Sequence, residues 1–132
     1  LLHNSSMQVR IKDAILHLVG LGDLWTEEFF PTTAFATRRP DKKMTALVLS
    51  HNPDTKDQLK AYDWDVVFCG HTHGGQLCLP LVGTPFAPVT DKRFVKGLHS
   101  WEGRWISITK GVGNLLGVRF NCRPEISLIT LA

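Results

Sequence analysis

Three histidines follow short apolar runs in a pattern that could hold a metal ion. His51 comes directly after the run at 45–50, and His71 and His73 come directly after the run at 65–70. Neutral imidazole is the commonest protein ligand for divalent transition metals. Glycines flank the two later histidines, and glycine allows the backbone to turn sharply enough to give the two imidazoles separate positions. The residue types and spacing therefore predict a metal site.

The elements that must position these histidines are short apolar strands. Residues 14–20, 45–50 and 65–70 are continuous apolar runs rich in branched side chains, as is typical of strands covered on both faces. Between the last two runs, Asp54 or Thr55 can begin a short helix that extends to about residue 60 or 61. Strand, helix and strand in this order predict a βαβ unit with two parallel strands.

This order explains why histidines twenty positions apart should meet. Open α/β sheets bind ligands at the carboxyl ends of their parallel strands, where all three histidines are expected to lie. A lone histidine at a strand end is more often structural, but three that converge on one edge favour metal binding. Three nitrogen ligands could form a single zinc site with one open position, completed by Asp54 or Asp23. The spacing leaves open whether the site holds one ion or two.

The rest of the chain is rich in turn residues, which interrupt its apolar runs. Residues 21–43 carry two prolines and no clean period, so we expect a long irregular excursion, which in a compact domain is often functional. Beyond Gly74, short apolar runs alternate with Gly, Pro and Asn turns, which predicts added antiparallel strands at 76–82, 104–111, 117–122 and 125–132. The expected fold class is α/β, a βαβ unit followed by mostly antiparallel strands.

Composition limits the class of protein. The chain has 132 residues, enough for one domain or a piece of one, and its net charge of +3 comes from scattered basic residues. Scattered charge indicates a solvated surface, and we expect no nucleic-acid partner. No apolar run approaches the roughly 20 residues that a membrane span needs.

The sequence gives only weak indications of where the protein resides. Three cysteines without a CxxC pair leave at least one free thiol, which leans toward a cytoplasmic protein. Leu1 opens no recognisable secretory signal, but it is not an initiator methionine, and we expect a segment upstream of it. The expected location is cytoplasmic or peripheral to the inner membrane, and an upstream export signal remains compatible with the sequence.

At these motifs the sequence resembles a known family. "LSHNPD" at 49–54 followed by "CGHTHGGQ" at 69–76 resembles the last two metal motifs of the calcineurin-like metallophosphoesterases. The segments at 20–25, 80–98 and 110–129 are similar to the bacterial YaeI-type phosphodiesterases in particular. The resemblance spans essentially the whole chain.

The resemblance implies a fold, a reaction and a ligand set. The fold would be part of an α/β/β/α sandwich of two sheets. The intact enzyme would hold two divalent ions, Mn, Fe or Zn, with His51 and His71 on one ion and His73 on the other. A metal-activated hydroxide would hydrolyse a phosphodiester, either a small molecule or a lipid headgroup. In the glycine-rich segment, Asn114 and Arg119 are possible substrate-binding residues, although a surface arginine is an equally good interpretation.

The departures from the family pattern matter as much as the match. The family's earlier motifs, Asp-x-His, Gly-Asp-x-x-Asp and Gly-Asn-His-Asp, are absent. Gly22-Asp23 resembles the start of the second motif, but the position that this motif fills with its last Asp is Thr26 here. Residues 1–132 therefore resemble the C-terminal portion of a single catalytic domain. Alone, it should be inactive, hold one ion or none, and expose apolar surface that promotes self-association. The alternative is a non-catalytic module that binds a single zinc ion or an interaction partner.

Overall fold

A computed structural model describes residues 1–37, 41 and 43–131 and contains one six-stranded sheet. In sheet order the strands are β1 (Ser5–Ile11), β2 (Ala14–Gly20), β3 (Thr45–Leu49), β4 (Val66–Cys69), β6 (Arg104–Ile108) and β5 (Gly97–Trp101). The helices are short: α1 (Pro31–Ala34), α2 (Thr55–Gln58) and the 3₁₀ turns η1 (His73–Gly75) and η2 (Lys92–Val95). Among the described residues, no helix is long and apolar enough to cross a bilayer.

The sheet is mixed. β2, β3, β4 and β6 run parallel, and β1 and β5 are antiparallel strands at the two edges. The predicted strands at 14–20, 45–50 and 65–70 are confirmed, and β3, α2 and β4 form the predicted parallel unit. The helix is shorter than expected and ends at Gln58, with Leu59 as its fully buried C-cap. The α/β fold class is confirmed.

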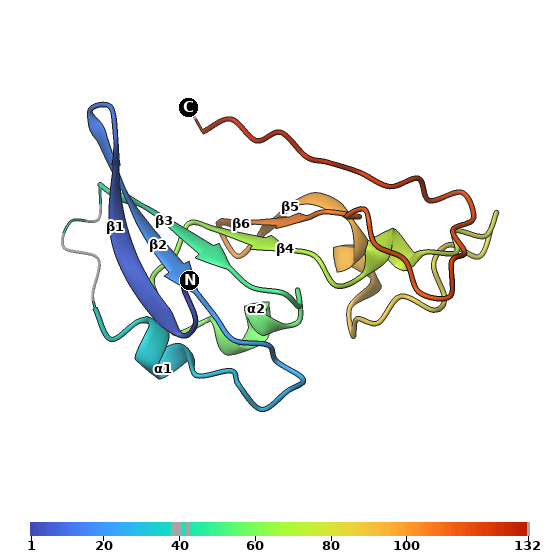
Figure 1. Cartoon of the computed structure of the whole chain (residues 1–132), viewed down its shortest axis with the longest axis horizontal. Helices are drawn as coiled ribbons and strands as arrows, with labels where there is room; N and C mark the ends of the chain where they lie inside the picture. Colours follow the sequence, from blue (N-terminus) through green and yellow to red (C-terminus); the bar gives the residue numbers. More distant parts are fainter. Residues whose placement is uncertain (38–40, 42, 132) are drawn as a thin grey trace.

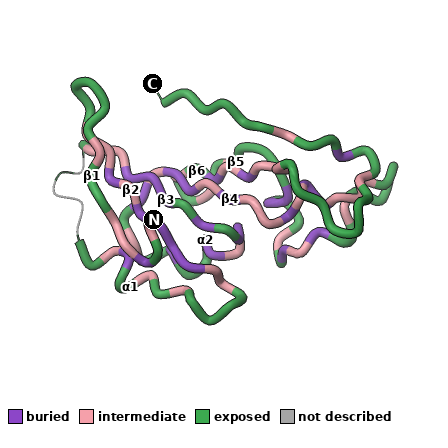
Figure 2. The backbone as a smooth tube through the Cα atoms, in the orientation of Figure 1, coloured by how far each residue is buried: buried purple, intermediate pink, exposed green. Residues whose placement is uncertain are grey.

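The core lies on one face of this sheet. Inward side chains of the central strands, among them Val19, Val48, Val67 and Ile106, are fully buried. They pack with Leu59 and with aromatic residues of the layer that holds α1 and α2. Figure 1 shows both helices on one side of the sheet and the C-terminal segment on the other, and Figure 2 shows burial concentrated along the central strands. The sheet is thus covered by helices on one side only.

The second half differs most from expectation. It contributes one antiparallel hairpin, β5–β6, and β6 joins the sheet in parallel beside β4. The segments 76–82, 117–122 and 125–131 form no strands, and the bridges recorded there join Leu77 to Phe120 and Leu79 to Gly83. Prolines interrupt or precede two of these segments, and proline has no N–H for a strand ladder. The last predicted strand ended at residue 132, which lies outside the described residues.

The structure adds two edge strands that we did not predict, β1 and β5. In β1, Met7, Val9 and Ile11 alternate with polar side chains, which is the period-two signal of a strand with one apolar face. β5 has only Leu98 as an aliphatic side chain and depends on pairing with β6. Propensity alone does not identify such a strand, because its stability comes from its neighbour.

One buried side chain anchors the irregular excursion that follows β2. Asn4 is 7% exposed, and its Oδ1 accepts hydrogen bonds from the backbone N–H groups of Gly22 and Phe30, each at 3.0 Å. Its Nδ2 donates to the carbonyl oxygen of Glu28 at 2.7 Å. The excursion is irregular apart from α1 in its described part, as predicted, and Asn4 determines its path.

We predict that Asn4→Ala destabilises the fold by about 2–4 kcal/mol, because it removes three hydrogen bonds of about 0.5–1.5 kcal/mol each and leaves buried donors unpaired. Urea unfolding followed by circular dichroism measures the change. The matched control is Asn121→Ala, since Asn121 is exposed and makes one 3.4 Å hydrogen bond. Equal effects of the two substitutions would contradict the anchoring role.

Candidate metal centre

Two of the three predicted histidines meet where β3 and β4 end. Backbone hydrogen bonds continue the pairing beyond the strands, from Ser50 N–H to Phe68 O at 3.1 Å and from Gly70 N–H to His51 O at 3.0 Å. This pairing brings His71 Nδ1 to 3.0 Å from His51 Nε2. One proton at most lies between two nitrogens in hydrogen-bond contact, so one of them presents a lone pair to the other.

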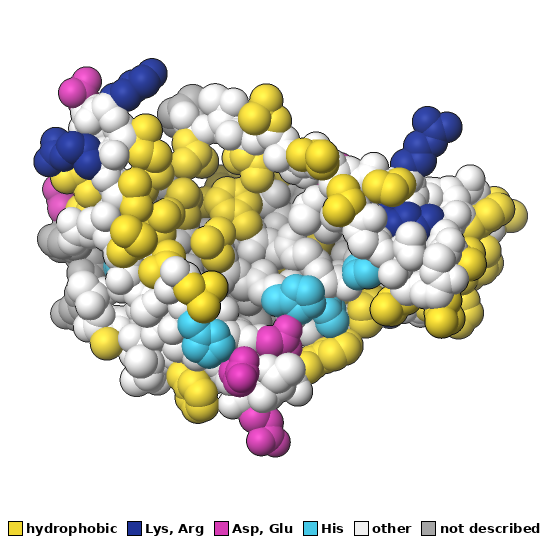
Figure 3. Space-filling model, in the orientation of Figure 1, with side chains coloured by type: hydrophobic (Ala, Val, Ile, Leu, Met, Phe, Trp, Pro, Cys, Tyr) yellow, Lys and Arg dark blue, Asp and Glu magenta, His cyan; other side chains and the backbone are white. Residues whose placement is uncertain are grey.

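Residues of the excursion after β2 flank this pair. Asp23 Oδ2 lies 3.9 Å from His51 Nε2, and Asp23 Oδ1 accepts a hydrogen bond of 2.7 Å from the backbone N–H of Trp25. The ring of Trp25 meets that of His71 edge-on, with centroids 4.3 Å apart. Figure 3 shows histidine side chains beside acidic ones on the face in view. The sequence pointed to Asp23 only as a possible completing carboxylate and did not place Trp25 beside the histidines, because both residues lie on a loop whose path depends on Asn4.

The backbone around the later histidines is held in an uncommon conformation. His71 has φ 65° and His73 has φ 50°, in the left-handed region that non-glycine residues rarely adopt. Between them, buried Thr72 donates to Val95 O at 2.6 Å and accepts from Gly74 N–H at 3.1 Å, which holds the turn. Such strain persists only where surrounding contacts over-determine it, and it clusters at functional sites.

The glycines after His73 are required for close packing. Gly74 has φ 64°, and a methyl group there would overlap Lys110 Cγ and lie 2.7 Å from the sulfur of Cys122. A methyl group at Gly75 would overlap the side chain of Thr84. The sequence predicted tight turning at these positions, and the structure adds that the turn is packed against the C-terminal part of the chain.

Two histidine nitrogens without hydrogen-bond partners indicate whether these residues are suited to bind a metal ion. His71 Nε2 and His73 Nδ1 are both buried and have no hydrogen-bond partner. Buried polar atoms are normally paired, so two such imidazole nitrogens on one turn are consistent with metal ligation. Within the described residues, however, no group of three or more His, Cys, Asp or Glu side chains is close enough to hold an ion together. The three histidines therefore do not converge on one ion.

The environment of His71 favours the neutral imidazole. Burial lowers the pKa of His71 below its ordinary value, and the neighbouring His51 lowers it further. Asp23 acts in the opposite direction but does not reverse the shift. A neutral imidazole is the form that binds metal ions.

The remaining candidates have other partners. Asp54, the alternative completing carboxylate, accepts hydrogen bonds from the backbone N–H of Thr90 at 2.9 Å and from its hydroxyl at 3.0 Å. Asn52 is 1% exposed, and its Nδ2 has no hydrogen-bond partner although it adjoins His51. The only signal for Asn52 in the sequence is its place directly after a candidate ligand, and we did not predict a role for it.

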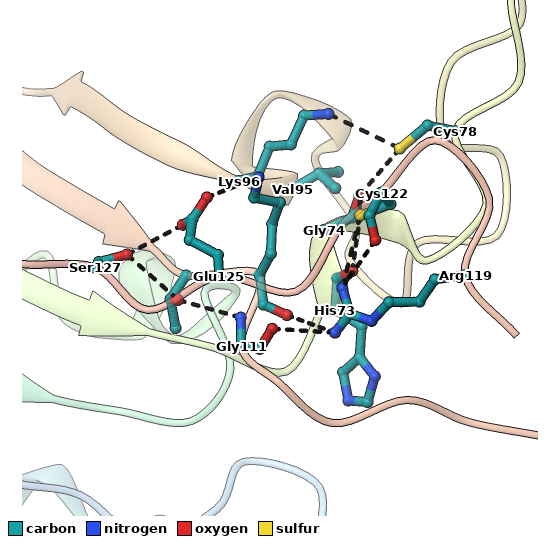
Figure 4. A network of polar contacts seen from close by, with 12 residues as sticks. His73, Gly74, Cys78, Val95, Lys96, Gly111, Arg119, Cys122, Glu125 and Ser127 are labelled. Atoms are coloured by element: carbon teal, nitrogen blue, oxygen red, sulfur yellow. Dashed lines mark hydrogen bonds and ion pairs between the residues drawn. The ribbon is translucent and has the colours of Figure 1, made fainter. Parts of the chain in front are cut away.

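Arg119 holds the main chain around His73. Its guanidinium donates to backbone oxygens of the turn and the glycine-rich loop, at 2.9 Å to Lys110, 3.2 Å to His73 and 3.3 Å to Cys122, and also to those of Gly111 and Gly113. Figure 4 shows this network with the imidazole of His73 directed away from it. All three nitrogens of its guanidinium already donate within the protein, and the role of Arg119 in substrate binding stays a prediction. Asn114 is exposed on the same loop.

Comparison with known proteins gives several relatives. Phosphodiesterase YaeI of Escherichia coli (strain K12) is 47% identical over 130 residues, which cover 98% of this chain and 46% of that protein. The UDP-2,3-diacylglucosamine pyrophosphatase LpxG of Chlamydia muridarum is 36% identical over 137 residues, 98% of this chain and 40% of LpxG. YkuE of Bacillus subtilis, named a metallophosphoesterase, is 32% identical over 94 residues, 70% of this chain and 33% of YkuE. No protein-family model matches, and no solved structure matches with significance.

The chain belongs to the calcineurin-like metallophosphoesterase family. It spans less than half the length of these metallophosphoesterase relatives. The resemblance seen in the His51 and His71–His73 motifs is thus confirmed at the level of the family. The assignment of His51, His71 and His73 as metallophosphoesterase ligands stays a prediction.

We predict that His71 titrates below the ordinary imidazole pKa of about 6.5 in the metal-free chain. NMR of the imidazole protons, with the His71 signal assigned by its loss in His71→Gln, measures this. Because the unfolded chain then takes up a proton first as pH falls, His71 should reduce stability as pH falls below about 6.5. A His71 resonance that titrates above that value would contradict the burial argument.

We also predict that Gly74→Ala destabilises the chain by about 2–4 kcal/mol, which combines about 1–2 kcal/mol for the left-handed backbone with the cost of overpacking. The control is Gly83→Ala, because Gly83 has φ 81° but open space around it. Gly83→Ala should cost only the backbone part, about 1–2 kcal/mol. Chemical denaturation of both variants separates the two effects, and equal losses would exclude the crowding.

Proposed function

We propose that this chain is part of a metal-dependent phosphodiesterase whose metal centre includes His51, His71 and His73. The observation that carries the proposal is the approach of His71 Nδ1 to His51 Nε2, 3.0 Å apart at the ends of adjacent parallel strands, which is close enough for the two nitrogens to share one ion. Family membership supports it, since the names of two relatives, a phosphodiesterase and a pyrophosphatase, both denote hydrolysis at phosphorus.

In this reaction the chain's own residues would bind the metal ions and hold the ligands in position. His51 and His71 would share one ion, held as neutral ligands so that the ion keeps its positive charge toward an anionic phosphodiester. Asp23 Oδ2 lies 3.9 Å from His51 Nε2, the same nitrogen that faces His71, so this carboxylate would stand beside the ion and add negative charge there. The ring of Trp25 packs against that of His71 and would limit the access of bulk water from that side. Divalent ions at such a centre supply Lewis-acid activation of water and of the phosphoryl oxygen.

We further propose that the complete centre holds two ions, Mn, Fe or Zn, with His73 on the second. The unpartnered Nδ1 of His73, on an imidazole that points away from the Arg119 network, supports this separate role. The described residues offer no group of three donors, so the chain alone should hold one ion or none and be inactive. The remaining ligands would come from a longer polypeptide of which residues 1–132 form the C-terminal portion.

The substrate class follows from the same reasoning. A phosphodiester small molecule or a lipid headgroup fits a positively charged centre, and LpxG is named for a diacylated nucleotide sugar. Asn114 is the candidate for substrate contact, because it is exposed on the loop that passes beside His73: a methyl group on its neighbour Gly113 would lie 3.7 Å from the His73 ring.

Metal content and activity together test the proposal. Elemental analysis of chain purified without a histidine tag should find about one ion or less, reduced further by His71→Ala and unchanged by His99→Ala, whose ring instead packs on Phe94. With added manganese, the chain should not hydrolyse bis(p-nitrophenyl) phosphate, whereas a longer version should, and His71→Ala should abolish that activity.

Two outcomes would count against this account. A longer version that shows no phosphodiesterase activity with any divalent metal, while the chain binds one zinc ion tightly and gains thermal stability, would favour a non-catalytic zinc module. Full activity of the longer version after His71→Ala would remove His71 from the centre. Metal bound equally by wild type and His71→Ala would have the same consequence.

A further inference from the structure

Two of the three cysteines, Cys78 and Cys122, face the same backbone oxygen. Cys78 Sγ donates to the carbonyl oxygen of Gly74 at 3.4 Å, and Cys122 Sγ donates to the same oxygen at 3.3 Å. The two sulfurs are therefore separated by no more than the sum of these distances, and Figure 4 shows both directed toward Gly74. All three cysteines are free thiols in this structure, and the third, Cys69, is buried in β4.

The backbone beside the pair is held at the spacing of neighbouring strands. Leu77 and Phe120 form an isolated parallel bridge, and the backbone N–H of Cys78 donates to the carbonyl oxygen of Phe120 at 2.9 Å. Neighbouring strands lie about 4.7–4.9 Å apart, which falls within the roughly 4.4–6.8 Å that separates the Cα atoms of most disulfides. The spacing of the two segments therefore suits a disulfide.

The conformation of Asn121 brings the two side chains to the same side. In a regular parallel ladder Asn121 would lie opposite Cys78, and Cys122 would point to the other face, because successive residues alternate between faces. Asn121 has φ 49°, in the left-handed region, so this alternation is broken just before Cys122. Both sulfurs then meet at the carbonyl group of Gly74, where an extended strand would have kept them apart.

The two thiols differ in how far they are buried. Cys122 is 4% exposed, whereas Cys78 is half-buried, so Cys78 is the thiol that a small solute reaches more easily. Burial raises the pKa of Cys78 and the neighbouring Cys122 raises it further, while Lys96, whose Nζ lies 3.8 Å from Cys78 Sγ, acts in the opposite direction. Cys78 is therefore not a strongly activated thiol, and what distinguishes it is the second thiol beside it.

We propose that Cys78 and Cys122 form a reversible disulfide that ties the turn bearing His73 to the C-terminal part of the chain. The oxidant is a low-molecular-weight disulfide such as oxidised glutathione. The Cys78 thiolate attacks one sulfur of the oxidant and releases one thiol, and the Cys122 thiolate then attacks the Cys78 sulfur of the mixed disulfide and releases the second thiol. One S–S bond forms in the chain while one breaks in the oxidant, and two hydrogen atoms pass from the chain to the oxidant.

The disulfide would change how the turn is held. In the reduced chain Cys122 Sγ also donates to the carbonyl oxygen of His73, at 3.2 Å. A disulfide has no S–H group, so oxidation replaces the thiol hydrogen bonds to His73 and Gly74 with a covalent link. This link closes the long loop from Cys78 to Cys122 and restricts the unfolded chain, so oxidation should stabilise the fold.

Mass spectrometry of the folded chain after exposure to oxidised glutathione tests the proposal. The wild type should lose the mass of two hydrogen atoms and keep one of its three thiols, and proteolysis should release a peptide pair joined through Cys78 and Cys122. Dithiothreitol should restore all three thiols. The Cys122→Ser variant should stop at the mixed disulfide and gain one glutathionyl group. The control is Cys69→Ala, which should form the same disulfide because Cys69 lies in β4, outside the pair.

Urea unfolding followed by circular dichroism provides a second readout. The unfolding midpoint should be higher for the oxidised than for the reduced wild type, and this difference should be absent in Cys122→Ser. If Cys122→Ser fails to fold, Cys78→Ser at the half-buried position carries the same expected loss of the disulfide. If the chain does not fold alone, the same peptide mapping on the longer version decides.

Three outcomes would overturn the proposal. They are a folded, glutathione-treated protein that keeps all three thiols, a disulfide that includes Cys69, and an oxidised wild type with a lower unfolding midpoint than the reduced one. None of these readouts involves metal binding or turnover, so they are independent of the proposed phosphodiesterase activity.

Discussion

The parallel pairing of β3 with β4 is the constraint on which the rest of this structure depends. Parallel strands end at the same edge of a sheet, so a side chain just beyond one strand meets its counterpart beyond the next. The pairing continues for two residues past the strands, and it places His51 and His71 in direct contact. Any change that shifts this register would separate the imidazoles.

The turn after β4 holds His71 and His73 in position at this edge of the sheet. Its left-handed histidines and crowded glycines are tolerated because packing holds them from both sides: Thr72 bonds to the end of η2, and Arg119 bonds the carbonyl of His73 to the glycine-rich loop. Residues distant in sequence thus stabilise a backbone that would not persist alone. The arginine acts through the main chain, and the imidazole of His73 points away from the arginine's hydrogen bonds.

The two faces of the sheet differ in how well they are covered, so the chain has both an ordered site and exposed apolar surface. One face buries a compact core under α1 and α2, which is sufficient to position the histidines. The other face is apolar and is partly covered by the C-terminal segment, and the histidines lie at the carboxyl ends of the parallel strands. Continuous apolar runs such as those of β3 and β4 are typical of strands covered on both faces, and Leu47 and Val66, which point away from the helices, are 7% and 9% exposed.

Local patterns in the sequence determined the central strands, the parallel unit and the histidines at its edge, because apolar runs and strand ends are properties of short segments. The alternation of apolar and polar residues in β1 is a signal of the same local kind. Only the tertiary structure decided the position of Asp23 and Trp25 beside the histidines, since their loop follows hydrogen bonds to Asn4. It also decided that Arg119 serves the backbone and that segment 125–131 forms no strand. Both outcomes depend on which partners lie within reach after folding, and no window of local sequence contains that information.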